Sequence, residues 1–82
     1  MENTKKAERT VTVGGCYRHF KGTVYRVKAI AMHTETEETL VVYEPLSGGK
    51  AYARPLDMFL SPVDREKYPD VDAVYRFEEI EE

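Results

Sequence analysis

A chain of 82 residues with 41% apolar residues, one cysteine and a net charge of −3 holds one small domain, which buries only about 60 to 65% of the surface that its unfolded form exposes. A lone cysteine excludes an internal disulfide, and no apolar run approaches the roughly 20 residues that span a bilayer. A core this small also leaves little room for a deep internal active site.

The charges are distributed unevenly along the chain. Residues 1–33 hold seven Lys or Arg and two acidic residues (+5), whereas residues 34–82 hold five Lys or Arg and thirteen acidic residues (−8). A wholly acidic chain would argue against a polyanionic partner, but this segregated basic part keeps nucleic acid open as a partner. The cysteine usage and the lack of a leader-like pattern predict a cytoplasmic protein with no membrane partner.

The pattern along the chain predicts a single β domain. We expect residues 1–13 to be disordered or loosely ordered, residues 14–80 to form the domain and residues 81–82 to be an acidic tail. Short runs rich in Val, Tyr, Ile and Thr between glycines or acidic clusters are typical of strands. These predicted strands are residues 16–20, 23–33, 39–46, 50–54, 60–63 and 74–80.

The first hairpin, around Lys21 and Gly22, has two possible registers. A two-residue loop would mix charged and aromatic side chains on both faces. A type I turn followed by Gly22 in the left-handed conformation pairs Tyr17 with Tyr25 and separates the faces, as one buried face requires. The two faces are then Tyr17, Tyr25, Val27, Ala29 and Ala31 on one side, and Arg18, Arg26 and Lys28 on the other.

The segment RPLDMF at residues 54–59 predicts a strand end followed by one helical turn. Pro55 suits the first position of that turn, because the N–H that it lacks would be unpaired there anyway. Five to six short strands with one short helical turn predict an all-β fold, a small curled barrel of the SH3 kind.

Several blocks of sequence in combination resemble a known family. They are YRHFKG at residues 17–22, MHTET at 32–36, LVVYEPL at 40–46, RPLDMF at 54–59 and RF at 76–77. The pattern is similar to that of the small bacterial proteins called domain of unknown function sixteen fifty-three, over about residues 15–77. The resemblance implies a compact, mainly β domain and says little about activity. Two positions depart from the family pattern: Tyr52 replaces a usual tryptophan, and Ser47-Gly48-Gly49 replaces a turn that usually contains an aromatic residue.

The two histidines suggest a metal site or a catalytic pair. Cys16 and His19 are three apart in a strand and point to opposite faces, and His33 follows far along the next strand, so we predict no metal and no cofactor. His33 and Glu35 share a face and form a weak catalytic candidate for proton transfer. No nucleophile accompanies them, and a histidine that ties a strand end to its loop is the favoured interpretation.

Basic and aromatic residues give the binding hypotheses. Arg18, Lys21, Arg26 and Lys28 could follow a single-stranded nucleic acid, with a tyrosine stacking on its bases, although a solvated outer face is the favoured interpretation. Arg54 and Arg76 lie within apolar strands, where each either pairs with a carboxylate, which is the favoured interpretation, or offers its fork to an anion. The candidate carboxylates are Glu35, Glu44 and Asp57.

The leading hypothesis is a non-enzymatic binding module, monomeric or weakly dimeric, that recognises a protein segment or a small anionic ligand through tyrosines and arginines. The alternatives are single-stranded nucleic-acid binding through the basic hairpin and a small enzyme that uses His33 and Glu35. The candidate ligand-binding residues are Tyr17, His19, His33, Tyr43, Tyr52, Arg54 and Arg76.

Overall fold

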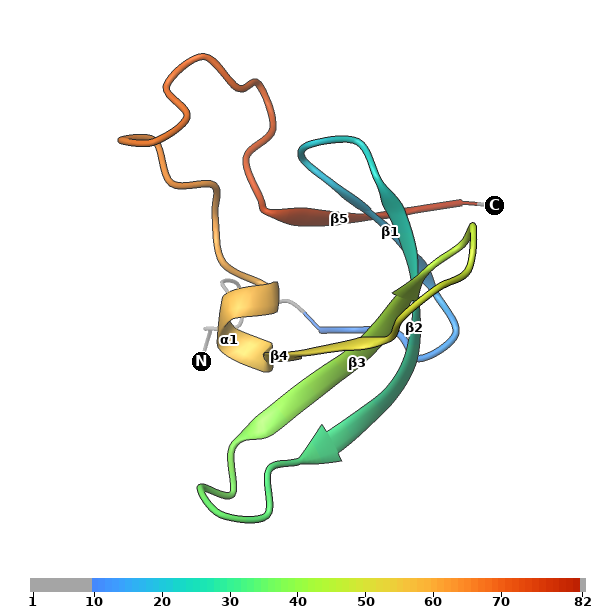
Figure 1. The fold of residues 1–82 in the computed structure, drawn as a ribbon. Helices are drawn as coiled ribbons and strands as arrows, with labels where there is room; N and C mark the ends of the chain where they lie inside the picture. The colour runs from blue at the N-terminus through green and yellow to red at the C-terminus, as the bar shows by residue number, and fades with distance from the viewer. Residues whose placement is uncertain (1–9, 82) are drawn as a thin grey trace, which may run out of the picture.

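The computed structural model describes residues 10–81, which form one curled antiparallel sheet and one helical turn (Figure 1). The elements are β1 (Cys16–His19), β2 (Val24–Met32), β3 (Thr39–Pro45), β4 (Tyr52–Pro55), α1 (Leu56–Phe59) and β5 (Phe77–Ile80). Their order in the sheet is β4-β3-β2-β1-β5, and in the described part of the chain no ladder joins β4 to β5. The predicted mainly β fold with one helical turn is confirmed, as a curled sheet that does not close into a barrel.

The first hairpin has the predicted register. Tyr17 pairs with Tyr25 and Arg18 pairs with Val24. Gly22 has a φ of 114°, which favours glycine, and its N–H donates a hydrogen bond to the carbonyl of His19 across 2.7 Å. The glycine therefore fixes which side chains of β1 and β2 face the core.

A β-bulge at Lys28 changes the faces of the second half of β2. Val27 lies opposite Tyr43, but Ala29 lies opposite Val42, so one residue of β2 has no partner between them. Because side chains alternate along a strand, one extra residue exchanges the two faces beyond it. The prediction that Ala29 and Ala31 continue the buried face is therefore wrong.

The predicted strand at residues 60–63 is also wrong. The segment forms only an isolated bridge, between Pro62 and Tyr75. Proline has no N–H to donate to a ladder, so a strand does not extend through this position. The last strand correspondingly begins at Phe77 rather than at residue 74.

Aromatic rings fill the inside of the curl. The buried residues of the core are Tyr17, Val27, Val41, Tyr43, Phe59 and Phe77. Phe59 is fully buried and stacks on Phe77 with ring centroids 4.1 Å apart and planes 9° apart. The helical turn α1 thus plugs the curled sheet, as Figure 1 shows. Pro55 immediately precedes the turn, one position before the predicted one.

The chain ahead of β1 packs on the same core. Val11 lies against the core cluster, and the Thr12 N–H donates a hydrogen bond of 2.9 Å to the Tyr17 hydroxyl. The predicted loose ordering of residues 1–13 falls largely on residues 1–9, which lie outside the described residues, and the domain bounds 14–80 stay a prediction. No helix within residues 10–81 is long and apolar enough to cross a membrane.

Replacing the plug tests this description of the core. Phe59→Ala removes a fully buried ring, so we expect the free energy of unfolding to fall by about 3 to 5 kcal/mol in a urea titration. Met58→Ala is the matched control, because Met58 lies on the same turn with 48% of its surface exposed, and it should cost less than about 1 kcal/mol. Equal losses for the two variants would contradict the role of Phe59 as the plug.

Candidate functional site

His19 ends β1, and aromatic rings hold its side chain. Its imidazole stacks on the Phe20 ring at a centroid distance of 4.5 Å. It also makes a T-shaped contact with the Phe77 ring, with centroids 4.9 Å apart and planes 79° apart. The Lys21 backbone N–H donates a hydrogen bond of 3.1 Å to Nδ1 of His19. Because Nδ1 is an acceptor, the neutral ring carries its proton on Nε2, which leaves Nε2 as a donor.

Positive groups surround this histidine. Burial lowers the pKa of His19 below the usual 6.5, and the charges of Arg54, Lys21 and Arg76 lower it further. His19 is therefore the neutral member of a group of otherwise positive side chains. We call these four residues, His19, Lys21, Arg54 and Arg76, the cationic cluster.

Arg54 reaches the cluster from β4. Its Nε donates a hydrogen bond of 3.1 Å to the hydroxyl of the buried Tyr43, and its guanidinium lies 5.6 Å from the centroid of the Phe77 ring. The phenol anchors one edge of the guanidinium and the ring supports it through a cation–π contact. The orientation of Arg54 is thus fixed by core residues.

Arg76, which directly precedes β5, is also held through a hydrogen bond from its Nε. Its Nε donates a hydrogen bond of 3.2 Å to Oγ of Ser61, and that hydroxyl donates to the Met58 carbonyl across 2.7 Å. Both arginines therefore use Nε for internal contacts. Within residues 10–81 the structure gives no acceptor for the other nitrogens of either guanidinium.

The carboxylate partners expected for these arginines lie elsewhere. Glu44 follows Tyr43 on β3, so its side chain points to the opposite face, where it forms an ion pair of 3.4 Å with Lys28. No carboxylate of the described residues forms an ion pair with Arg54 or Arg76. The pairing that the sequence suggested is wrong for this part of the chain.

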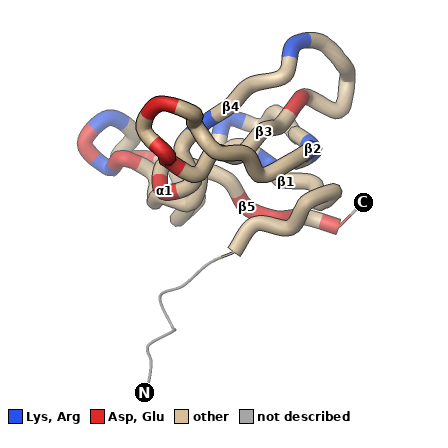
Figure 2. The backbone as a smooth tube through the Cα atoms, turned by 90° about the horizontal axis from the view of Figure 1, so that it is seen from below, with Lys and Arg blue, Asp and Glu red and all other residues tan. Residues whose placement is uncertain are grey.

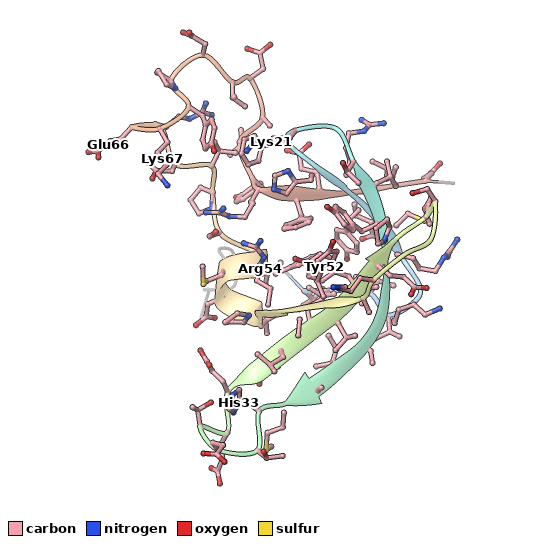
Figure 3. The ribbon with its side chains drawn as sticks, in the orientation of Figure 1. Lys21, His33, Tyr52, Arg54, Glu66 and Lys67 are labelled. Atoms are coloured by element: carbon pink, nitrogen blue, oxygen red, sulfur yellow. The ribbon has the colours of Figure 1, made fainter. Side chains whose placement is uncertain are left out.

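An exposed tyrosine lies beside Arg54. Tyr52 precedes it by two residues on β4, so both side chains share a face of the strand, and Figure 3 shows them next to each other. The Tyr52 ring contacts Tyr43 at 5.9 Å and Tyr25 at 6.5 Å, yet 47% of the residue stays exposed. The site thus combines fixed cations with an accessible ring.

The loop between α1 and β5 packs against Phe20 and Lys21 of the first hairpin turn. Tyr68 packs on Phe20 at 4.9 Å, and the Lys21 ammonium lies 5.1 Å from the centroid of the Tyr68 ring. Arg65 holds the loop through hydrogen bonds from its guanidinium to the carbonyls of Val71 and Ala73. Sequence reasoning missed Tyr68, although a lone aromatic residue in the polar segment DREKYPD was a usable signal.

His33 lies far from this cluster. It stands at the tip of the β2–β3 hairpin, at the opposite end of the molecule from Lys21 (Figure 3). Its Nδ1 accepts hydrogen bonds from the backbone N–H groups of Glu35 at 3.1 Å and Thr36 at 3.3 Å. The contact with Glu35 is thus made by its backbone, and the ring closes the hairpin turn.

Two other predicted candidates also have structural contacts. Tyr17 is 1% exposed, and its hydroxyl donates to the Glu79 carboxylate across 3.4 Å, so it belongs to the core rather than to a ligand surface. Cys16 is buried. Within residues 10–81 no group of three or more His, Cys, Asp or Glu side chains could hold a metal ion.

The basic residues of the outer hairpin face stand among acidic neighbours. Arg26 donates a hydrogen bond of 2.8 Å to the Gly14 carbonyl and lies opposite Glu44, and Arg18 lies opposite Glu78. Figure 2 shows the acidic positions of β5 beside β1. Lys21 belongs to the cationic cluster on the other side, so the four residues predicted for nucleic acid do not form one continuous basic surface.

A shallow hollow of about 150 Å³ lies beside α1. It is lined by Glu38, Thr39, Pro55, Leu56 and Asp57. It contains no member of the cationic cluster, and its two carboxylates would repel an anion. The hollow and the cationic cluster are therefore separate features.

Residues 15–79 match the family described as "Protein of unknown function (DUF1653)". The chain belongs to the DUF1653 family. The match confirms the resemblance that the sequence blocks indicated, and it includes the whole cationic cluster and Tyr52. No curated protein and no solved structure matches the chain. For this DUF1653 protein, the geometry of the site is therefore the basis for inferring a function.

The cluster predicts a measurable pKa change. Arg54→Gln removes a neighbouring positive charge, so we expect the pKa of His19 to rise from its lowered value, while burial keeps it below 6.5. The measurement is an NMR titration of the His19 ring in both proteins. Arg18→Gln removes the same charge from the outer face of β1 and should leave the pKa unchanged. Equal shifts in the two variants would contradict the clustering.

The same pKa predicts how stability depends on pH. Since the folded state lowers the pKa of His19, the unfolded chain binds more protons than the folded protein between that pKa and 6.5. The contribution of His19 to stability is therefore present above pH 6.5 and is lost as the pH falls through 6.5 toward the folded-state pKa. Urea unfolding at pH 7.5 and pH 5.5 should show a larger loss for the wild type than for His19→Gln. An equal loss would contradict this linkage.

Proposed function

We propose that this DUF1653 protein is a binding module that holds the anionic group of a small molecule at the cationic cluster. One observation carries the proposal. Two guanidinium groups are fixed through Nε beside a neutral histidine, and no described carboxylate balances them. Such an arrangement costs electrostatic free energy in the free protein, because like charges repel in a partly desolvated place.

An anion removes this cost and uses the available donors. The unanchored edge of each guanidinium can donate to an oxyanion, and planar guanidinium groups suit phosphate and carboxylate oxygens. The Nε2–H of His19 and the ammonium of Lys21 add two further kinds of donor. Because Tyr43 and Ser61 hold the two arginines through Nε, little side-chain entropy is lost when the anion binds.

The alternatives have less support from the geometry. A nucleic-acid backbone needs a continuous basic surface, whereas Arg18 and Lys28 stand beside Glu78 and Glu44 on the outer face. An enzyme built on His33 needs a pocket and a reacting partner beside the imidazole, whereas the Nδ1 of His33 accepts from two backbone N–H groups of the hairpin turn and His33 does not line the hollow beside α1. A protein segment would present an acidic side chain to the same cationic cluster, so it is a variant of the anion hypothesis.

The test is an NMR titration of the isotope-labelled protein with inorganic phosphate at low ionic strength. We expect saturable shifts at the four cluster residues and a dissociation constant on the order of 1 mM, since a single small anion supplies only about 4 kcal/mol. Arg54→Gln should weaken phosphate binding about tenfold or more, because it removes charge-assisted hydrogen bonds.

Arg18→Gln is the matched control, because it removes one positive charge from a residue outside the cluster. It should leave the dissociation constant for phosphate unchanged. Shifts spread equally over Arg18, Arg26 and the cluster, or equal weakening by both variants, would mean that phosphate senses only the overall charge. Either result, or no shift at all, would overturn the proposed function.

A further inference from the structure

We propose that the ligand is a phosphate monoester carrying a planar ring, of the nucleoside 5′-monophosphate class, with Tyr52 as the stacking surface for the ring. This inference rests on the proposed function, since the phosphate would occupy the cationic cluster. The observation that carries it is the placement of a half-exposed, well-supported aromatic ring two residues from a fixed guanidinium on one face of β4.

Tyr52 has the support that a stacking surface needs. Its ring leans on Tyr43 with planes 39° apart and meets Tyr25 at 81°, so neighbouring rings hold it from within the molecule. Nevertheless 47% of the residue is exposed. A ring held in place on one side and open on another can stack on a planar ligand without first being ordered.

The spacing joins the two halves of the site. Tyr52 and Arg54 are two positions apart, which is roughly 7 Å along β4, and both side chains contact Tyr43. A ligand that stacks on the first residue and offers an anion to the second therefore needs a short linker between ring and anion. The sugar of a nucleoside 5′-monophosphate is a linker of this kind.

The number of positive groups favours phosphate over carboxylate. A phosphate monoester has three terminal oxygens and a charge between about −1.5 and −2 near neutral pH, whereas a carboxylate has two oxygens and one charge. Lys21, Arg54 and Arg76 supply three positive charges around one histidine. A dianion balances this charge better and can accept from both guanidinium groups at once.

The approach to the site is open from the edge of the sheet. β4 is the first strand in the sheet order and pairs only with β3 within residues 10–81. The SGGK turn at residues 47–50 that precedes it is exposed. A small ligand can therefore reach Tyr52 and Arg54 from this side without crossing another strand.

The experiment compares four probes by NMR titration or calorimetry: inorganic phosphate, ribose 5-phosphate, adenosine and adenosine 5′-monophosphate. We expect adenosine 5′-monophosphate to bind about tenfold or more tightly than ribose 5-phosphate, because base stacking adds to the phosphate contacts. Tyr52→Ala should reduce the affinity for adenosine 5′-monophosphate to the level of that for ribose 5-phosphate. The affinity for ribose 5-phosphate itself should not change in this variant. Tyr52→Phe should retain the preference, since the ring remains.

The controls separate this inference from the proposed function. Met58→Ala, another half-exposed residue, should affect no probe, and an amide spectrum should confirm that each variant is folded. If phosphate binds but adenosine 5′-monophosphate binds no better than ribose 5-phosphate, the ring inference is overturned and the anion site stands. If adenosine 5′-monophosphate binds through Tyr52 while Arg54→Gln has no effect on any phosphate probe, the anion site is overturned instead. If no probe binds, both are overturned.

Discussion

The stacking of Phe59 on Phe77 is the contact on which the rest of the structure depends. It joins α1 to β5, beside the bridge between Pro62 and Tyr75, and so holds the plug against the curled sheet. The Phe77 ring also contacts His19 from β1 and the Arg54 guanidinium from β4. One buried ring thus positions both the hydrophobic core and the polar groups above it. The site is built directly on the core rather than on a separate loop.

This construction explains why unbalanced cations can persist in so small a domain. A long, mobile arginine would turn toward solvent to reduce repulsion, but hydrogen bonds to Tyr43 and to Ser61 fix the two guanidinium groups. Burial, together with the same positive charges, lowers the pKa of His19 and so favours its neutral form. Under the proposed function, an anion bound at the cationic cluster would release the free energy stored in this repulsion. Stability of the free protein and the proposed anion binding would then be opposed, as is common at functional sites.

The sequence predicted local features better than tertiary ones. Gly22 and the alternation around it were enough for the register of the first hairpin, and RPLDMF was enough for the helical turn. The bulge at Lys28 was not predictable, because it depends on how the curl of β2 fits β3. His19, Arg54 and Arg76 were each recognised as candidates, but their approach to one another was not, since it depends on packing around Phe77. The sequence groups Lys21 with the basic residues of the outer face. Strand alternation does not predict the direction of a side chain in the turn, so this placement could not be corrected from the sequence.

The basic residues of the outer face and those of the cationic cluster differ mainly in whether nearby carboxylates balance their charges. On the outer face, Lys28 is paired with Glu44 and Arg18 lies opposite Glu78, so this surface is already compensated within the chain. On the inner side, Arg54 and Arg76 have neutral partners, a phenol and a hydroxyl, which orient a guanidinium without cancelling its charge. A protein that needed these arginines only for stability would gain more from a carboxylate at either position. Neutral anchors keep the positive charge available, and this is the property that an anion-binding site requires.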